Sequence, residues 1–211
     1  MRLYTANSPN SLKAQMAFAE LGLDYERSDV VLAKREQLSD DFKRINPHQM
    51  VPVLEVDGAH IAESGAIVQY LGRTNTGELW PADPLQDALL SRWMFFESVH
   101  LAPSCRAIWW TDILSPRRGV PASSDAQLEL AAADLERPLS ALETHLDPQE
   151  FVSQNGFTLA DCALGVAVSM LKDTRLDPSD RWPNVGAYGA RIRARESWTT
   201  GLGDRCLHWA D

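Results

Sequence analysis

The sequence has few cysteines, no long apolar run and no excess of positive charge. Its three cysteines, Cys105, Cys162 and Cys206, are scattered and odd in number, which does not suit a disulfide framework. The longest mostly apolar run, 160–171, contains Asp161 and falls well short of the ~20 residues that span a bilayer. Since 29 Asp and Glu outnumber 20 Lys and Arg, the formal net charge is −9. That charge argues against nucleic acid or an anionic membrane as the main partner.

Signatures of secretion, metal binding and several catalytic classes are also missing. The amino-terminal segment lacks the apolar stretch of a secretory signal, and no Asn-x-Ser/Thr acceptor occurs, so we expect a cytoplasmic protein. There is no Cys-x-x-Cys and no His-Glu-x-x-His, only Cys206 near His208, and we expect no metal ion. The glycine patterns of nucleotide sites and the Gly-x-Ser-x-Gly nucleophile elbow are absent as well.

What the sequence does contain is enough apolar material for a packed core, with 45% hydrophobic and 23% charged residues. Strand-like runs occur at 2–5, 25–32, 51–56 and 59–62. Helical patterns occur at 11–21, 33–45 and 64–71. The last two strands flank Asp57-Gly58, a strong hairpin signal. The order β-α-β-α-β-β-α predicts one small mixed sheet with helices packed against it.

The pattern changes near residue 75. We expect an amino-terminal domain at 1–75, a linker at 76–86 anchored by Leu79-Trp80, and an all-helical domain at 87–211. Apolar residues recur there at helical spacing over 85–113, with a bend at Pro103, and over 125–146, 157–171 and 185–194. The apolar residues at helical spacing in these patterns, and in the helix expected at 33–45, include Leu38, Leu89, Phe95, Val99 and Leu130. Thr158-Leu-Ala-Asp161 has the spacing of a capping box.

Three short segments have the residue types of a binding site. Ser8 precedes a proline at a predicted helix start, where unpaired N–H groups and the positive dipole end would stabilise a thiolate or another anion. Val51-Pro52 opens a strand, where a cis bond would leave the backbone of Val51 free to pair with a peptide-like ligand. Glu63-Ser64, at the next helix start, suits an α-amino acid head group. Taken singly, each has a structural alternative: a helix cap, an edge-strand proline and another helix cap.

Taken together and in order, these segments resemble the cytosolic glutathione S-transferases. The segments that carry the resemblance are Ser8-Pro9-Asn10-Ser11, Asn46-Pro47-His48-Gln49-Met50-Val51-Pro52-Val53-Leu54 and Glu63-Ser64-Gly65-Ala66-Ile67-Val68-Gln69-Tyr70-Leu71. Segments 158–161 and 182–185 extend the similarity over nearly the whole chain. The resemblance implies a thioredoxin-like domain that binds glutathione as co-substrate, an all-α domain that supplies most of the second-substrate pocket, a homodimer and a role in detoxification.

The resemblance also implies roles for single residues. Ser8 matches the catalytic hydroxyl of serine-type members. Val51 matches the residue before the cis-proline, here Pro52, and the backbone of that residue pairs with the cysteinyl part of glutathione. Glu63 and Ser64 match the pair that holds its γ-glutamyl end.

Two positions depart from common family patterns. Asn10 stands where beta-type bacterial members carry a cysteine, and Ser8-Pro9-Asn10 is similar to the Thr-Pro-Asn of nu-type members, where the asparagine also faces the thiol. Met50 occupies a place where many relatives have Lys or Gln for the glycyl carboxylate, and Gln49 is the candidate for that contact.

The expected chemistry is activation of the glutathione thiol as a thiolate that attacks a small hydrophobic electrophile. Ala102, Arg106 and Trp109 are candidates for the second-substrate wall, where an arginine favours anionic or oxygen-rich electrophiles; aromatic residues at helical spacing are otherwise core. The alternatives are a glutathione-dependent isomerase, dehalogenase or disulfide reductase, and a non-enzymatic glutathione-transferase-like interaction protein, which Met50 would favour.

Overall fold

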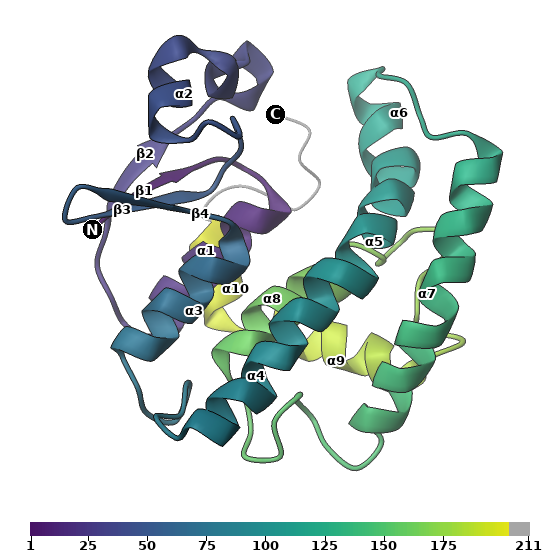
Figure 1. The fold of residues 1–211 in the computed structure, drawn as a ribbon. Coiled ribbons are helices and arrows are strands. Elements are labelled where there is room, and N and C mark those ends of the chain that lie inside the picture. The colour runs from purple at the N-terminus through teal and green to yellow at the C-terminus, as the bar shows by residue number, and fades with distance from the viewer. Residues whose placement is uncertain (203–211) are drawn as a thin grey trace.

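The computed structural model of the chain describes residues 1–202 and comprises a small α/β domain followed by a helical domain (Figure 1). The α/β domain contains, in chain order, β1 (Arg2–Thr5), α1 (Pro9–Glu20), β2 (Glu26–Asp29), α2 (Asp40–Ile45), β3 (Val53–Val56), β4 (Ala59–Ala62) and α3 (Ser64–Thr74). Its strands form one sheet in the order β2-β1-β3-β4. The β1–β2 pair is parallel and the other two pairs are antiparallel. The predicted thioredoxin-like domain is confirmed.

Successive side chains along the strands point to opposite faces of the sheet, and both faces are covered by helices. Leu3 of β1 and Leu54 of β3 pair with each other and are fully buried in the core that contains α1 and α3. Val53, the next residue along β3, packs with Phe42 of α2 on the opposite face. Figure 1 shows α1 and α3 below the sheet and α2 above it. The sheet is thereby fixed between α2 and the helices that contact the second domain.

The hairpin prediction is confirmed, whereas β2 is shorter than expected. β3 and β4 pair in antiparallel register around Asp57 and Gly58, whose φ angles of 50° and 80° suit a two-residue turn. β2 ends at Asp29, opposite Thr5, because β1 offers no further residue for pairing. The expected strand over 25–32 is therefore wrong at both ends.

The single helix expected over 33–45 is also wrong. The chain there forms two short 3₁₀ turns, Leu32–Lys34 and Glu36–Leu38, before α2 begins. The turns are separated by Arg35, whose φ of 59° is incompatible with a continuous helix. As a consequence Leu38, expected on the inward side of the helix, is 40% exposed.

The second domain is helical, as predicted. Its helices are α4 (Pro84–Phe96), α5 (Ala102–Trp109), α6 (Ser115–Arg118), α7 (Asp125–Leu146), α8 (Leu159–Ser169), α9 (Pro183–Arg193) and α10 (Glu196–Leu202), the last without a counterpart in the predicted pattern. Every residue of α8 is buried, and α8 packs against α1, α3, α4 and α9. A helix that is apolar all round belongs in a core, so α8 holds the two domains together.

The path from Pro84 to Arg118 is helical throughout and contains two π-helical turns, Glu97–Leu101 and Trp110–Leu114. Each π turn ends two residues before a proline, Pro103 or Pro116. Proline has no N–H to donate to the preceding turn, which accounts for the changed hydrogen bonding there. The expected irregularity at Pro103 is thus a π turn.

One side of α4 and of the π turn that follows is apolar and exposed. Leu89, Phe95 and Val99 are 38%, 64% and 61% exposed. Leu90, Trp93 and Met94 form the buried side instead. The helix is apolar on two sides, and only one of them meets the core. Assigning all of these apolar residues to the core would be wrong, as it would for Leu130 of α7, which is 67% exposed.

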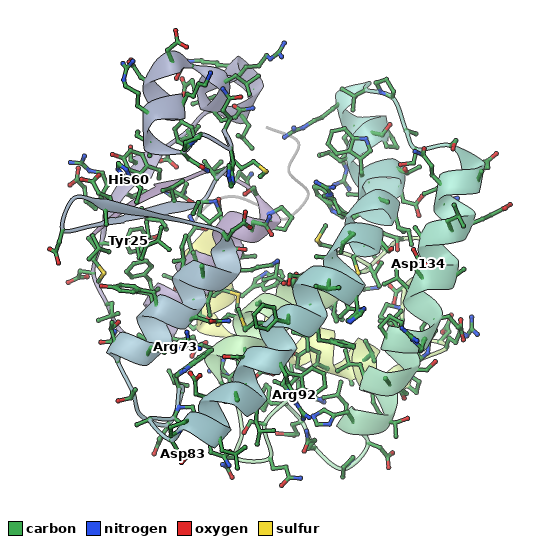
Figure 2. All side chains as sticks on the ribbon, in the orientation of Figure 1. Tyr25, His60, Arg73, Asp83, Arg92 and Asp134 are labelled. Atoms are coloured by element: carbon green, nitrogen blue, oxygen red, sulfur yellow. The ribbon has the colours of Figure 1, made fainter. Side chains whose placement is uncertain are left out.

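The predicted anchor between the domains is confirmed at Trp80, which is fully buried. Its Nε1 donates to Oδ1 of Asp87 at 2.7 Å. Arg73, labelled in Figure 2, donates two hydrogen bonds of 2.9 Å to the same carboxylate. The indole lies against α3 at Gly72, where a Cβ atom would come within 2.5 Å of it.

The predicted capping box at the start of α8 is confirmed and is part of a larger network. Asp161 Oδ2 accepts hydrogen bonds from the amide and hydroxyl of Thr158, at 2.8 and 2.9 Å. Its Oδ1 accepts from the Val152 amide and the Tyr188 hydroxyl, both at 3.0 Å. Burial raises the pKa of Asp161 to about 6, although all of these hydrogen bonds act to lower it.

Candidate functional site

A cavity of about 330 Å³ is lined by residues from the start of α1 and from the α5–α6 stretch. Five residues singled out from the sequence line it, namely Ser8, Asn10, Ala102, Arg106 and Trp109. The first two come from the thioredoxin-like domain and the other three from the helical domain. The structure therefore brings the candidate hydroxyl and the candidate second-substrate wall into one cavity.

Ser8 caps α1 and is held by a second serine. Its backbone is extended, and its Oγ accepts a hydrogen bond of 3.2 Å from the amide of Ser11. The two hydroxyl oxygens lie 2.9 Å apart. Ser11 is fully buried, and its Oγ also accepts from the amide of Ala6 at 3.2 Å. Ser8 therefore acts as a helix cap, and Ser11 fixes the position of its hydroxyl.

The other residues expected to contact glutathione lie at the same end of the sheet as Ser8 but do not line this cavity. Val53 of β3 pairs with Tyr4 of β1 on one side and with Ala62 of β4 on the other. The segments after β1, before β3 and after β4 therefore meet at one edge. These segments carry Ser8, then Gln49, Met50, Val51 and Pro52, then Glu63 and Ser64. The peptide bond between Val51 and Pro52 is cis.

The segment before β3 is organised by Asn46, whose side chain is buried. Its Nδ2 donates to the carbonyl oxygen of Met50 at 2.8 Å, and its Oδ1 accepts from the His48 amide at 3.0 Å. Gln49 has a φ of 56°, a conformation that nonglycine residues rarely adopt. Met50 is 55% exposed, and its side chain has no cationic or amide group to offer a carboxylate.

The start of α3 differs from the sequence expectation in one respect. Glu63, not Ser64, is the N-cap residue; it has a φ of 70°, and no side-chain hydrogen bond caps the helix. Ser64 is the first helical residue and is buried. The first amides of α3 thus lack a side-chain acceptor, an arrangement that suits an anionic ligand.

A buried ion pair borders the cavity and was not anticipated from the sequence. Lys13 of α1 lines the cavity, and its Nζ lies 2.6 Å from Oε1 of Glu97, with both side chains 4% exposed. A lysine among Leu12, Ala14 and Met16 is a signal that a buried partner exists. Its identity was not predictable, because Glu97 follows 84 residues later and belongs to the other domain.

The described cysteines do not supply a reactive thiolate. Cys105 and Cys162 are fully buried. Burial raises the pKa of both thiols, and the nearby carboxylate of Glu97 raises that of Cys105 further. Cys206 and the Cys206-Leu-His208 segment lie outside the described residues.

Residues 1–202 show no membrane-spanning helix and no metal centre. No helix in this range combines the length and apolarity needed to cross a membrane. Nor does this part of the chain gather three or more His, Cys, Asp or Glu side chains into a group that could hold a metal ion.

Comparison with known proteins gives the family of this chain. The family model "Glutathione S-transferase, N-terminal domain" matches residues 1–73, and "Glutathione S-transferase, C-terminal domain" matches residues 125–191. The chain belongs to the glutathione S-transferase family and is a glutathione transferase.

Its similarity to individual relatives extends over most of the chain. Glutathione S-transferase 3 of Zea mays is 31% identical over 90% of this chain and 87% of its own length. A glutathione S-transferase of Hyoscyamus muticus is 28% identical over 93% of this chain and 94% of its own. The crystal structure of a theta-class enzyme of Xanthomonas axonopodis pv. citri with glutathione bound has a TM-score of 0.84 and 25% identity, covering 98% of each chain.

Proposed function

We propose that this enzyme binds glutathione at the edge of the sheet beside Ser8, ionises its thiol, and bonds the thiolate sulfur of glutathione to a small hydrophobic electrophile in the interdomain cavity. The observation that carries the proposal is that Ser8 and Asn10 line the same cavity as Arg106 and Trp109. The chain resembles serine-type, nu- or beta-like bacterial members, and its Ser8-Pro9-Asn10 is similar to the Thr-Pro-Asn of nu-type members, which supports Ser8 as the hydroxyl donor.

The energetic demand on Ser8 is modest. A thiol with a pKa of ~8.5 is only about 3% ionised at pH 7. Lowering that pKa by about two units takes roughly 2.7 kcal/mol of preferential thiolate stabilisation. One charge-assisted hydrogen bond of ~1.5–3 kcal/mol and a helix-end contribution of ~0.3–1 kcal/mol supply this amount. No general base is required.

Ser11 acts as a positioning residue in this proposal. Hydroxyl groups donate one hydrogen bond and accept two, and they exchange these roles by rotation. In the structure the Ser8 hydroxyl donates to Oγ of Ser11. When the two hydroxyls rotate so that Ser11 donates to Ser8, the oxygen of Ser8 accepts from both the amide and the hydroxyl of Ser11, and its own hydrogen is free for the thiolate sulfur. Such a chain strengthens the last donor. Asn10, exposed at the second position of α1, offers an amide N–H to the same sulfur.

The tripeptide itself is assigned to the three segments at the sheet edge. Val51, held by the cis bond to Pro52, presents its backbone to the cysteinyl part. The carboxylate of Glu63 pairs with the γ-glutamyl ammonium, and the Ser64 hydroxyl and first amides of α3 bind the γ-glutamyl carboxylate. The side chain of Gln49 takes the glycyl carboxylate in place of Met50.

The transfer step is a displacement or an addition at carbon. The thiolate sulfur donates its electron pair to the electrophilic carbon, and a C–S bond forms. In a displacement the bond to the leaving group breaks and that group departs with its electron pair. In an addition the π bond of the electrophile breaks, its electron pair moves to the far atom, and that anion takes a proton from solvent. The thiol proton goes to solvent before the attack. Ala102, Arg106 and Trp109 bound the space in which the electrophile lies.

The wider context of the enzyme follows the family. We assign a homodimer in which the exposed apolar side of α4, with Leu89, Phe95 and Val99, is covered by a second copy. We also assign a cytoplasmic location, a role in detoxification, and domain limits of 1–75 and 87–211 joined by a linker at 76–86. In the described structure the last three linker residues, 84–86, already belong to α4.

Steady-state kinetics with glutathione and 1-chloro-2,4-dinitrobenzene test the proposal. Ser8→Ala should lower kcat/KM by about 10- to 100-fold, because the charge-assisted hydrogen bond to the thiolate is lost. Ser98→Ala is the matched control, because Ser98 lines the same cavity from the other domain and, among residues 1–202, its side chain hydrogen-bonds only to the nearby carbonyl oxygen of Phe95. Equal activity in the two variants would contradict the role of Ser8.

A further inference from the structure

We infer that the interdomain cavity selects second substrates that are aromatic anions, and that Lys13 and Arg106 are the residues that select them. The inference rests on the proposed function insofar as the cavity holds the electrophile. Three cationic side chains, those of Lys13, Arg106 and Arg118, line the cavity. No Asp or Glu of residues 1–202 is among its lining residues, on a chain whose net charge is −9. Such a local reversal of sign attracts anions.

Lys13 places a positive charge at the inner wall of the cavity. Its ammonium has three donors, and Glu97, its hydrogen-bond partner, is not itself a lining residue. Lys13 is therefore the member of the pair that borders the cavity, and Glu97 lies behind it. Because Lys13 follows Ser8 by five residues, roughly 7 Å along the helix axis, an anion beside Lys13 would lie close to the sulfur site.

Arg106 provides the second anion contact at the outer wall. Its side chain is exposed, and within residues 1–202 it makes no ion pair or hydrogen bond with another residue. A guanidinium that no residue of 1–202 engages offers a planar fork of donors that matches a carboxylate or sulfonate.

The remaining wall fits a flat ring. Trp109 and Trp110 contribute indole rings to the lining, and Leu114 and Met170 contribute apolar side chains. The polar edge of Trp110 is already used, since its Nε1 donates to the carbonyl oxygen of Pro121 at 3.0 Å. Aromatic and sulfur-containing side chains of this kind pack well against an aromatic ligand. The combined surface suits a ring that carries one carboxylate, sulfonate or phenolate group.

The anion takes no part in the bond changes. With an activated aryl halide that carries a carboxylate, the thiolate sulfur bonds to the ring carbon and the halide leaves with its electron pair. The carboxylate remains on the ring, where its contacts with Lys13 and Arg106 hold the reacting carbon near the sulfur.

Calorimetric titration with 2-naphthoate and 2-naphthamide at pH 7 tests the charge preference without any reaction. The two probes share one ring system and differ in charge. We expect naphthoate to bind at least tenfold more tightly, with a preference that shrinks as salt is added. Equal affinities, or a preference for naphthamide, would overturn the inference.

Two variants assign the preference to residues. Arg106→Gln should weaken naphthoate binding about fivefold and leave naphthamide unchanged, whereas Arg137→Gln, an exposed arginine of α7 outside the cavity, should change neither. Lys13→Met combined with Glu97→Met keeps the net charge constant and should weaken naphthoate binding about tenfold. An undiminished preference for naphthoate over naphthamide in both Arg106→Gln and the double variant would contradict the assignment. Thermal unfolding of each variant verifies that it is folded.

A glutathione titration on the same samples separates this inference from the proposed function. Failure to bind glutathione would contradict the proposed function, whereas the naphthoate result could still be interpreted. Naphthoate that binds alongside saturating glutathione supports the inference. Naphthoate that is displaced by glutathione would overturn it, because the cations would then belong to the glutathione half of the site.

Discussion

Lys13 of α1 and Glu97 of the first π turn form an ion pair of 2.6 Å between the two domains, with both side chains 4% exposed. The pair lies beside the cavity that contains Ser8. Two charges at this depth are retained only when each compensates the other. The pair therefore couples the stability of the domain contact to the shape of the site.

Removing one partner of this ion pair should lower the stability of the protein strongly, whereas removing both should change it little. Glu97→Met alone leaves an uncompensated buried ammonium and should lower the free energy of unfolding by about 3–5 kcal/mol. The double variant Lys13→Met, Glu97→Met should lie close to the wild type. Urea unfolding measures both. A single variant as stable as the double variant would contradict the importance of the pairing.

Gly72 and Gly77 form a matched pair for testing the anchor at Trp80. Gly72→Ala would place a Cβ atom 2.5 Å from the indole and should destabilise the protein by about 1–3 kcal/mol or more. Gly77→Ala meets no atom within 4 Å and should change stability by less than ~0.5 kcal/mol. Chemical denaturation of both variants checks the difference. Equal effects would show that the indole is not tightly packed against α3.

Asp161→Asn should destabilise the helical domain by about 2–4 kcal/mol. Both carboxylate oxygens accept hydrogen bonds, so the amide N–H₂ of an asparagine must face donors on one side. Asp134→Asn is the control, because Asp134 lies on the exposed side of α7 (Figure 2). Thermal melts of the two variants provide the measurement, and a neutral Asp161→Asn would contradict the network.

Glu20 should contribute a pH-dependent part of the stability. Burial alone would raise its pKa, but hydrogen bonds from Arg195 and Ser197, with the charge of Arg195, outweigh burial and hold the pKa below its usual value. The unfolded chain therefore binds this proton more readily than the native protein does. The stabilisation is present above the usual glutamate pKa and is lost as pH falls through the native pKa.

Urea unfolding between pH 7 and pH 3 tests this sign. The stability difference between the wild type and Glu20→Gln should shrink on acidification. Glu129→Gln, at an exposed position of α7, should show no such trend. A difference that grows toward low pH would contradict the argument.

The sequence predicted the elements that have strong local signals. Asp57-Gly58 located the hairpin, Ser8-Pro9 the start of α1, and Thr158 with Asp161 the start of α8. These signals depend on turn and cap chemistry within a few residues, so neighbouring sequence contains them.

Features that depend on distant partners were not predictable. Leu38 and Leu130 have the right spacing for a core position, yet no other element covers them. The Lys13–Glu97 pair and the meeting of Ser8 with Arg106 depend on how the domains dock. Periodicity shows that a helix has an apolar side, but not which neighbour that side meets.

The central claim, that Ser8 stabilises the glutathione thiolate, is tested most directly by ultraviolet thiolate absorbance as a function of pH. The wild type with saturating glutathione should show a thiol pKa about two units below that of free glutathione. Ser8→Ala should bind glutathione but return that pKa close to the free value. An unshifted pKa in the wild type, or an equally lowered pKa in Ser8→Ala, would contradict the account.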